Sequence, residues 1–83
     1  MFSMNEWVLR GKVEKVSCNQ KGYWIVVKGA AENPSVFTSD VCKMDCWISN
    51  RVLGNKSIKD DIFVVGRLKF KKNECFFVAD RVA

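Results

Sequence analysis

Apolar residues recur at every second position along nearly the whole of this chain of 83 residues. A period of two sends alternate side chains to opposite faces of a β-strand, whereas an amphipathic helix needs a period of about 3.6. Three turn-forming segments interrupt the alternation, namely "CNQKG" at 18–22, "AAENPS" at 30–35 and "KKNE" at 71–74. The pattern predicts an all-β fold, and the length allows one small domain over residues 1–83.

The first predicted strand covers residues 7–17, and the second begins at Gly22 and ends at Val27 or Gly29. The inward side chains of the first strand are Trp7, Leu9, Gly11 and Val13, and Gly11 marks a position where a strand can bend or bulge. The second strand, "GYWIVVKG", turns one face inward with Tyr23, Ile25 and Val27. Its outward face carries Trp24, Val26 and Lys28. Because an indole ring is costly to expose to water, a ligand or a partner is expected to cover Trp24.

Residues 39–53 allow two interpretations. A helix would begin at Ser39 as its cap and end before Gly54. A strand would direct one set inward, Cys42, Met44, Cys46 and Ile48, and the other set outward, Lys43, Asp45, Trp47 and Ser49. The strand is favoured because its inward set is entirely apolar, whereas the helix would leave Trp47 and Cys46 off its apolar stripe.

The last two predicted strands form a hairpin around "KKNE". The fourth strand lies within "DIFVVGRLKFK", residues 61–71, and its inward side chains are Ile62, Val64, Gly66, Leu68 and Phe70. Its outward side chains are Phe63, Val65, Arg67, Lys69 and Lys71. The fifth strand is "CFFVADRVA", and residues 50–60 form a short irregular link before the fourth. Five strands with a long coiled first member predict a closed Greek-key barrel, because closure removes exposed sheet edges.

Composition narrows the classes of function. The formal charge of +5, from 14 basic and 9 acidic residues, favours a polyanionic partner. No apolar run is long enough to cross a bilayer and residues 1–7 lack the features of a secretory signal, so a cytoplasmic location without a membrane partner is expected. The chain has no histidine and no evident nucleophile elbow, phosphate loop or carboxylate pair. Neither an enzyme nor a cofactor is expected.

Four cysteines, Cys18, Cys42, Cys46 and Cys75, lie among apolar neighbours without any Cys-x-x-Cys pair. Free cysteine behaves as a small core residue, so buried free thiols without metal are predicted. A four-cysteine zinc site and disulfides are the alternatives.

Four segments resemble the bacterial single-stranded DNA-binding proteins and their relative, the primosomal replication protein. "NEWVLRGKV" at 5–13 is similar to that family's first strand and "CKMDCWISN" at 42–50 to its third. "SIKDDIFVVGRLKF" at 57–70 and "ECFFVADRV" at 74–82 resemble its fourth and last strands. The resemblance implies a five-stranded OB-fold Greek-key barrel, with a small barrel of the SH3 type as the alternative. The sequence departs from the family in lacking an acidic tail and a convincing helix between the third and fourth strands.

In this fold the ligand groove lies over strands two and three and the loops after strands one and four. Trp24 and Trp47 would then stand outward on neighbouring strands among basic side chains, as stacking platforms for bases. A subunit interface and plain packing are the other interpretations of these rings. The predicted nucleic-acid-binding residues are Trp24, Trp47, Lys28, Lys43, Arg10, Lys12, Lys21, Phe37, Arg67, Lys69, Lys71 and Lys72.

These residues predict a sequence-tolerant binder of single-stranded DNA that assists replication, recombination or repair. Its expected partners are single-stranded DNA, with RNA possible, and a replication helicase, primase or polymerase. The family also implies a homodimer. The alternative functions are a protein-interaction module, such as a subunit of a replication complex, and an RNA-binding OB domain.

Overall fold

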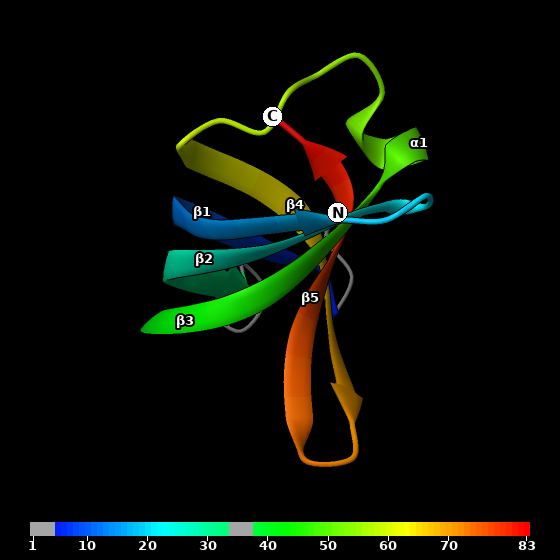
Figure 1. Ribbon diagram of the computed structural model, residues 1–83. Helices are drawn as coiled ribbons and strands as arrows, with labels where there is room; N and C mark the ends of the chain where they lie inside the picture. The colour runs from blue at the N-terminus through cyan, green and yellow to red at the C-terminus, as the bar shows by residue number, and fades with distance from the viewer. Residues whose placement is uncertain (1–4, 34–37) are drawn as a thin grey trace.

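The computed structural model describes the backbone of residues 5–33 and 38–83, and the side chains of residues 5–33 and 43–83. In the described part of the chain, five strands and one helical turn follow one another (Figure 1). They are β1 (Trp7–Cys18), β2 (Gly22–Asn33), β3 (Thr38–Ser49), α1 (Asn50–Leu53), β4 (Asp61–Lys71) and β5 (Glu74–Val82). The strands close into a barrel in the order β1-β2-β3-β5-β4, which confirms the predicted five-stranded barrel.

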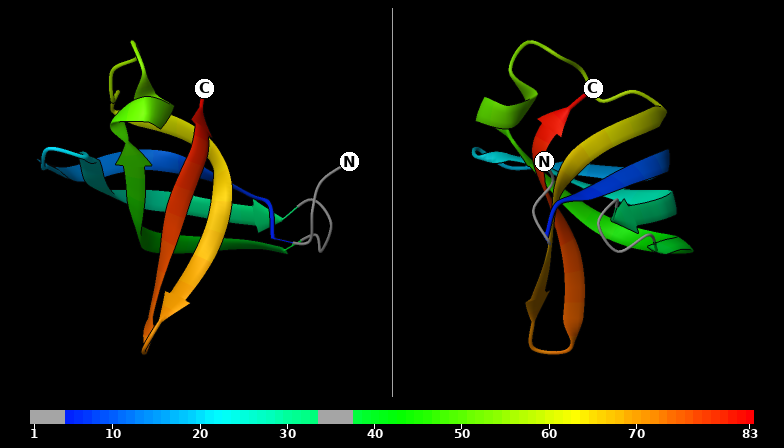
Figure 2. Two further views of the ribbon diagram at one scale, coloured as in Figure 1. Left: turned by 90° about the vertical axis from the view of Figure 1, so that its right-hand side faces the viewer. Right: turned by 180° about the vertical axis from the view of Figure 1, so that it is seen from behind.

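The barrel closes through a short contact between β3 and β5. β1 pairs antiparallel with both β2 and β4, and β4 pairs antiparallel with β5. In contrast, β3 and β5 run parallel and pair only at Cys46 with Phe77 and at Trp47 with Val78. The end of the β4–β5 hairpin extends away from the other strands, and α1 lies near the C-terminal residue at the opposite end of the molecule (Figures 1 and 2).

The core consists of the side chains that the alternation places inward. Ile25 and Val27 of β2 are buried with Cys46 and Ile48 of β3, as predicted. Among the other described residues, the buried apolar side chains are Leu9, Ala31, Ile62, Val64, Phe77, Ala79 and Val82 of the strands and Leu53 of α1. Residues 39–49 are therefore strand, and the strand interpretation is confirmed for them.

Two predictions about strand boundaries and irregularities are wrong. β2 continues to Asn33 instead of ending at Val27 or Gly29, because Ala30 and Ala31 still pair with both β1 and β3. The irregularity of β1 falls between Val13 and Lys15 and not at Gly11. Gly11 lies directly opposite Gly29, where a Cβ atom would come within 2.3 Å of the Lys28 carbonyl oxygen. This glycine therefore allows close approach of two backbones.

The link after β3 contains a helical turn that was not predicted. The Ser49 side chain caps α1 by accepting a hydrogen bond of 3.2 Å from the Val52 backbone N–H. Leu53 packs into the core, and Gly54 ends the turn with a positive φ of 59°. The rejected helical interpretation of residues 39–53 therefore correctly identified Gly54 as a stop, but the helix begins after the strand.

Phe70 is the clearest error in the predicted faces, because its side chain is 77% exposed instead of buried. It lies in the part of β4 that pairs with β5 near the hairpin end, beyond the other strands of the barrel. There the alternation still assigns a face, but no opposite wall exists to cover it.

The predicted burial of the cysteines holds for one of the three whose side chains are described. Cys46 is a buried free thiol, and burial raises its pKa to about 12. Cys18 and Cys75 are free thiols. Both are exposed, because Cys18 lies at the end of β1 and Cys75 lies near the end of the hairpin. The side chain of Cys42 lies outside the described residues.

No helix in the described part of the chain has the length and apolar character needed to cross a membrane.

Candidate functional site

Three aromatic side chains meet on the outer surface of the barrel. The ring centroids of Trp24 and Trp47 are 5.3 Å apart, and those of Trp24 and Phe76 are 5.6 Å apart in an edge-on arrangement. Trp24 is 38% exposed, and the other two are partly exposed. We call Trp24, Trp47 and Phe76 the aromatic cluster; it brings together partly exposed rings from three different strands.

Strand register brings the cluster together. Trp24 lies directly opposite Trp47 in the β2–β3 pairing, and Trp47 is paired with Val78 across the short parallel contact with β5. Phe77 is fully buried, so its neighbour Phe76 points outward to the same face. The outward positions of Trp24 and Trp47 were predicted. Phe76 was missed, although two adjacent phenylalanines in one strand must face opposite sides.

Gly22, the first residue of β2, leaves space for the Trp47 ring. A Cβ atom on the buried Gly22 would lie 3.0 Å from Cη2 of the Trp47 ring and 2.4 Å from the Ile48 carbonyl oxygen. Any larger residue would push the indole and the β3 backbone away. Gly22 therefore helps to fix the position of the ring.

Three lysines form a row across the same outer face. Lys12, Lys28 and Lys43 are directly opposite one another on β1, β2 and β3, and all three are exposed. Like charges at directly opposite positions of a sheet disfavour the fold. We call these residues the lysine row. It lies four positions along β2 from Trp24, about 13 Å at the usual rise of a strand.

Carboxylates adjoin the lysine row. Glu14 makes an ion pair of 2.9 Å with Lys43. The hydrogen bond that the Glu14 carboxylate accepts from Lys43 lowers the pKa of Glu14, with a smaller contribution from the charge of Lys28. Asp61 lies opposite Lys12 in the β1–β4 register, and the exposed Asp45 separates the row from Trp47 along β3. The row is thus only partly free to receive an external anion.

Two predicted cations flank the aromatic cluster from β4. Lys69 is paired with Phe76, and Arg67 is paired with Val78, the residue that also pairs with Trp47. Arg67 also makes an exposed ion pair of 3.4 Å with Asp80. Lys69 makes no salt bridge to any other described residue. The register therefore places both residues beside the cluster.

The hairpin end adds two further predicted cations. Lys71 and Lys72 are exposed, and Lys72 adopts a positive φ of 56° in the turn. The exposed Phe70 ring is their neighbour in sequence. Sequence reasoning assigned these lysines to the site but placed Phe70 in the core.

The structure does not bring every predicted residue to the cluster. Arg10 is opposite Ala30, far along β2 from Trp24, and its guanidinium makes an ion pair of 2.8 Å with Glu32. Lys21 lies in the β1–β2 loop, which is held to α1 because the Asn50 backbone N–H donates to the Lys21 carbonyl at 3.0 Å. Phe37 lies outside the described residues.

Comparison with known proteins identifies a related fold. No family model and no curated protein sequence matches the chain. The crystal structure of a small single-stranded DNA binding protein from Mycoplasma pneumoniae is similar, with a TM-score of 0.62 and 12% sequence identity. The match covers 98% of this chain and 93% of that chain. The similarity and the observed strand order show that this chain adopts a closed five-stranded OB-fold barrel, as the sequence resemblance implied.

Proposed function

We propose that this protein binds single-stranded DNA without strong sequence preference, on the outer face of β2, β3 and β5. The observation that carries the proposal is the aromatic cluster, three partly exposed rings from three strands, flanked by Lys69 and Arg67. Every base has a π-face, so stacking on such rings is worth about 1–3 kcal/mol per base regardless of sequence. Cations beside the rings can neutralise phosphates.

The solved structure with the same fold supports this proposal, because it is that of a small single-stranded DNA binding protein. The excess of basic residues in the whole chain agrees with a polyanionic ligand. We extend the proposal to the role expected from the sequence resemblance, an accessory in replication, recombination or repair that assists a helicase, primase or polymerase. A homodimer remains a prediction of the same resemblance.

Binding to labelled oligonucleotides tests the proposal. Fluorescence anisotropy with labelled oligothymidine is expected to give saturable binding that unlabelled oligothymidine reverses and duplex DNA of the same length reverses poorly. Oligouridine is the matched competitor for RNA, since it differs at the 2′-hydroxyl and the thymine methyl group. An anisotropy that does not rise at low salt would reject the proposed function and favour the protein-interaction alternative.

Replacing Glu14 with glutamine is expected to tighten binding. The substitution removes the carboxylate that pairs with Lys43, so this lysine becomes available to a phosphate. One added phosphate contact would steepen the log-log salt dependence by about 0.7. Anisotropy titrations over a series of salt concentrations measure this slope. Asp60→Asn, which removes an exposed carboxylate outside the lysine row, is the control and should leave the slope unchanged. An unchanged slope in Glu14→Gln would show that Lys43 does not contact phosphate.

The ion pair between Glu14 and Lys43 should make both the stability of the fold and DNA binding depend on pH. The pKa of Glu14 is lower in the folded protein than the ordinary value of 4.5, so the pair stabilises the fold above pH 4.5. This contribution is lost as the pH falls through the lowered pKa, because the carboxyl becomes protonated. In the wild-type protein, acidification through this pH range should therefore release Lys43. The difference in DNA affinity between the wild type and Glu14→Gln should then become smaller.

Replacing Lys71 and Lys72 together with alanine is expected to reduce the salt dependence of binding by up to about 1.4 in the log-log slope. Both side chains are exposed at the hairpin end, so the melting temperature should stay close to that of the wild type. Anisotropy titrations and thermal melts measure the two quantities. A slope equal to that of the wild type would mean that these lysines belong to a solvated turn outside the DNA path.

A further inference from the structure

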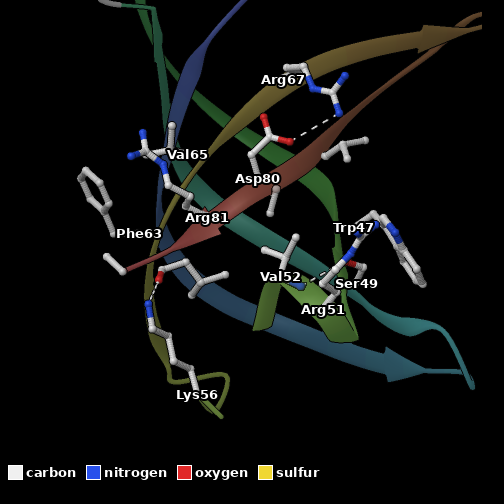
Figure 3. Close-up of a pocket in the computed structure, with 14 residues that line it drawn as sticks. Trp47, Ser49, Arg51, Val52, Lys56, Phe63, Val65, Arg67, Asp80 and Arg81 are labelled. Carbon is white, nitrogen blue, oxygen red and sulfur yellow. Dashed lines mark hydrogen bonds and ion pairs between the residues drawn. The ribbon is translucent and has the colours of Figure 1, made fainter. Parts of the chain in front are cut away.

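A groove of about 820 Å³ adjoins the aromatic cluster and was not anticipated from the sequence. It runs over the C-terminal half of β5, between α1 and the beginning of β4. Trp47 and Arg51 lie on one side, and Phe63 and Arg81 lie on the other (Figure 3). We call this feature the α1–β5 groove.

The groove is strongly cationic. Four basic side chains line it, namely Arg51, Lys56, Arg67 and Arg81, whereas Asp80 is the one carboxylate side chain among the described lining residues. Asp80 is paired with Arg67. Arg81 has only a loose contact of 3.7 Å with Glu6 and is 70% exposed. Arg51 is exposed and makes no salt bridge to another described residue. The two arginines are therefore available to an anion.

Hydrogen bonds to backbone carbonyl oxygens hold Lys56 and the turn that carries Arg51 in place. Lys56 donates from Nζ to the Val82 carbonyl oxygen, which ties the loop after α1 to the end of β5. Asn50, at the start of α1, donates from its backbone N–H to Lys21 and from Nδ2 to Gln20 at 2.9 Å. Arg51 thus projects from a turn that is fixed at both ends of the α1 region.

The groove and the aromatic cluster form one continuous surface. Trp47 belongs to both, since its ring contacts Trp24 and also lines the groove. Along β5, Phe76 lies in the cluster, Val78 beside Trp47, and residues 79–83 in the groove. Phe63 is 44% exposed and offers a second aromatic surface on the far side of the groove.

We infer that the α1–β5 groove is a second subsite for the same single strand of DNA. This inference rests on the proposed function. Bases stacked on the aromatic cluster position the following nucleotides over the groove, where Arg51 and Arg81 bind phosphates and Phe63 stacks a base. The alternating rings and cations favour nucleic acid over an acidic peptide, which offers charges but no flat bases. The DNA path therefore continues from the aromatic cluster along β5 toward α1.

The dependence of affinity on oligonucleotide length tests this inference. An oligothymidine of about 4 nucleotides is short enough to occupy the cluster alone, whereas one of about 16 reaches the groove, within the range known for single OB folds. Arg51→Ala/Arg81→Ala is expected to bind the short oligothymidine like the wild type. With the long one, its log-log salt slope should be shallower by about 1.4, the value for two lost phosphate contacts.

Controls separate the inference from the proposed function. Lys59→Ala removes an exposed lysine from the same α1–β4 connection but outside the groove, and should keep the wild-type slope. Equal binding and equal slopes of the double variant and the wild type on the long oligothymidine would overturn the second subsite while leaving the cluster intact. An oligoglutamate peptide is the probe for the alternative ligand. If the wild type binds this peptide, the double variant does not, and long oligothymidine does not compete, the second DNA subsite is overturned and the groove is assigned to acidic peptides. Failure of the wild type to bind either oligothymidine would instead reject the proposed function itself.

Discussion

Replacing Ile25 with alanine is expected to lower the free energy of unfolding by about 2–5 kcal/mol. Ile25 is 1% exposed and points from β2 into the barrel, opposite the buried Cys46 of β3. The truncation removes buried methyl and methylene groups and leaves a cavity that the closed barrel cannot readily fill. Urea denaturation followed by circular dichroism measures the change.

Val16→Ala is the matched control for this substitution. Val16 lies opposite Ile25 in the β1–β2 register, but its side chain is 51% exposed, so its loss should change the stability by only about 0.5 kcal/mol. The folded fraction of Ile25→Ala should still bind oligothymidine, because the substitution lies on the inner face. Equal destabilisation by the two variants would show that Ile25 contributes no more to the core than the exposed Val16.

Replacing Trp24 with alanine is expected to weaken binding to single-stranded DNA by about 1–3 kcal/mol, roughly 5- to 150-fold in Kd. Trp24 is the central ring of the aromatic cluster, in contact with both Trp47 and Phe76. Loss of these contacts should cost some stability, about 0.5–1.5 kcal/mol for each aromatic pair beyond the area buried. The domain should nevertheless remain folded. Anisotropy titrations and urea denaturation measure the two effects.

Trp24→Phe separates the loss of stacking from the loss of packing. Phenylalanine keeps a flat ring at the same position, so this variant should recover much of the affinity lost in Trp24→Ala. If both variants bind DNA as tightly as the wild type, the aromatic cluster is not where the bases stack. If Trp24→Ala unfolds the domain, the ring is structural and Trp24→Phe decides whether it also binds.

The faces of the strands could be predicted from the sequence because alternation in β-structure is a local property. Ile25, Val27, Cys46 and Ile48 are buried as their positions required. Alternation does not reveal where a barrel ends, so Phe70 was assigned to a core that does not extend to the hairpin end. The helical turn at 50–53 was missed because four residues are too few to show a helical period.

The candidate site was predictable only where strand neighbours were known. The facing of Trp24 and Trp47 followed from pairing of consecutive strands. Arg10 shares their face but is too far along the strand, since face alone does not set distance. Phe76 reaches the cluster through the parallel contact of β5 with β3, and Arg81 lines the groove beside α1. Both placements depend on closure of the whole barrel.

Tryptophan emission during DNA binding tests the central claim most directly. Trp7 packs against the core, so a Trp7→Phe variant leaves Trp24 and Trp47 as the remaining emitters. Titration of this variant with oligothymidine is predicted to quench its emission to saturation, at the same concentrations that raise the anisotropy of labelled oligothymidine. Emission that stays constant while the anisotropy rises would contradict the account, because the DNA would then bind away from the aromatic cluster.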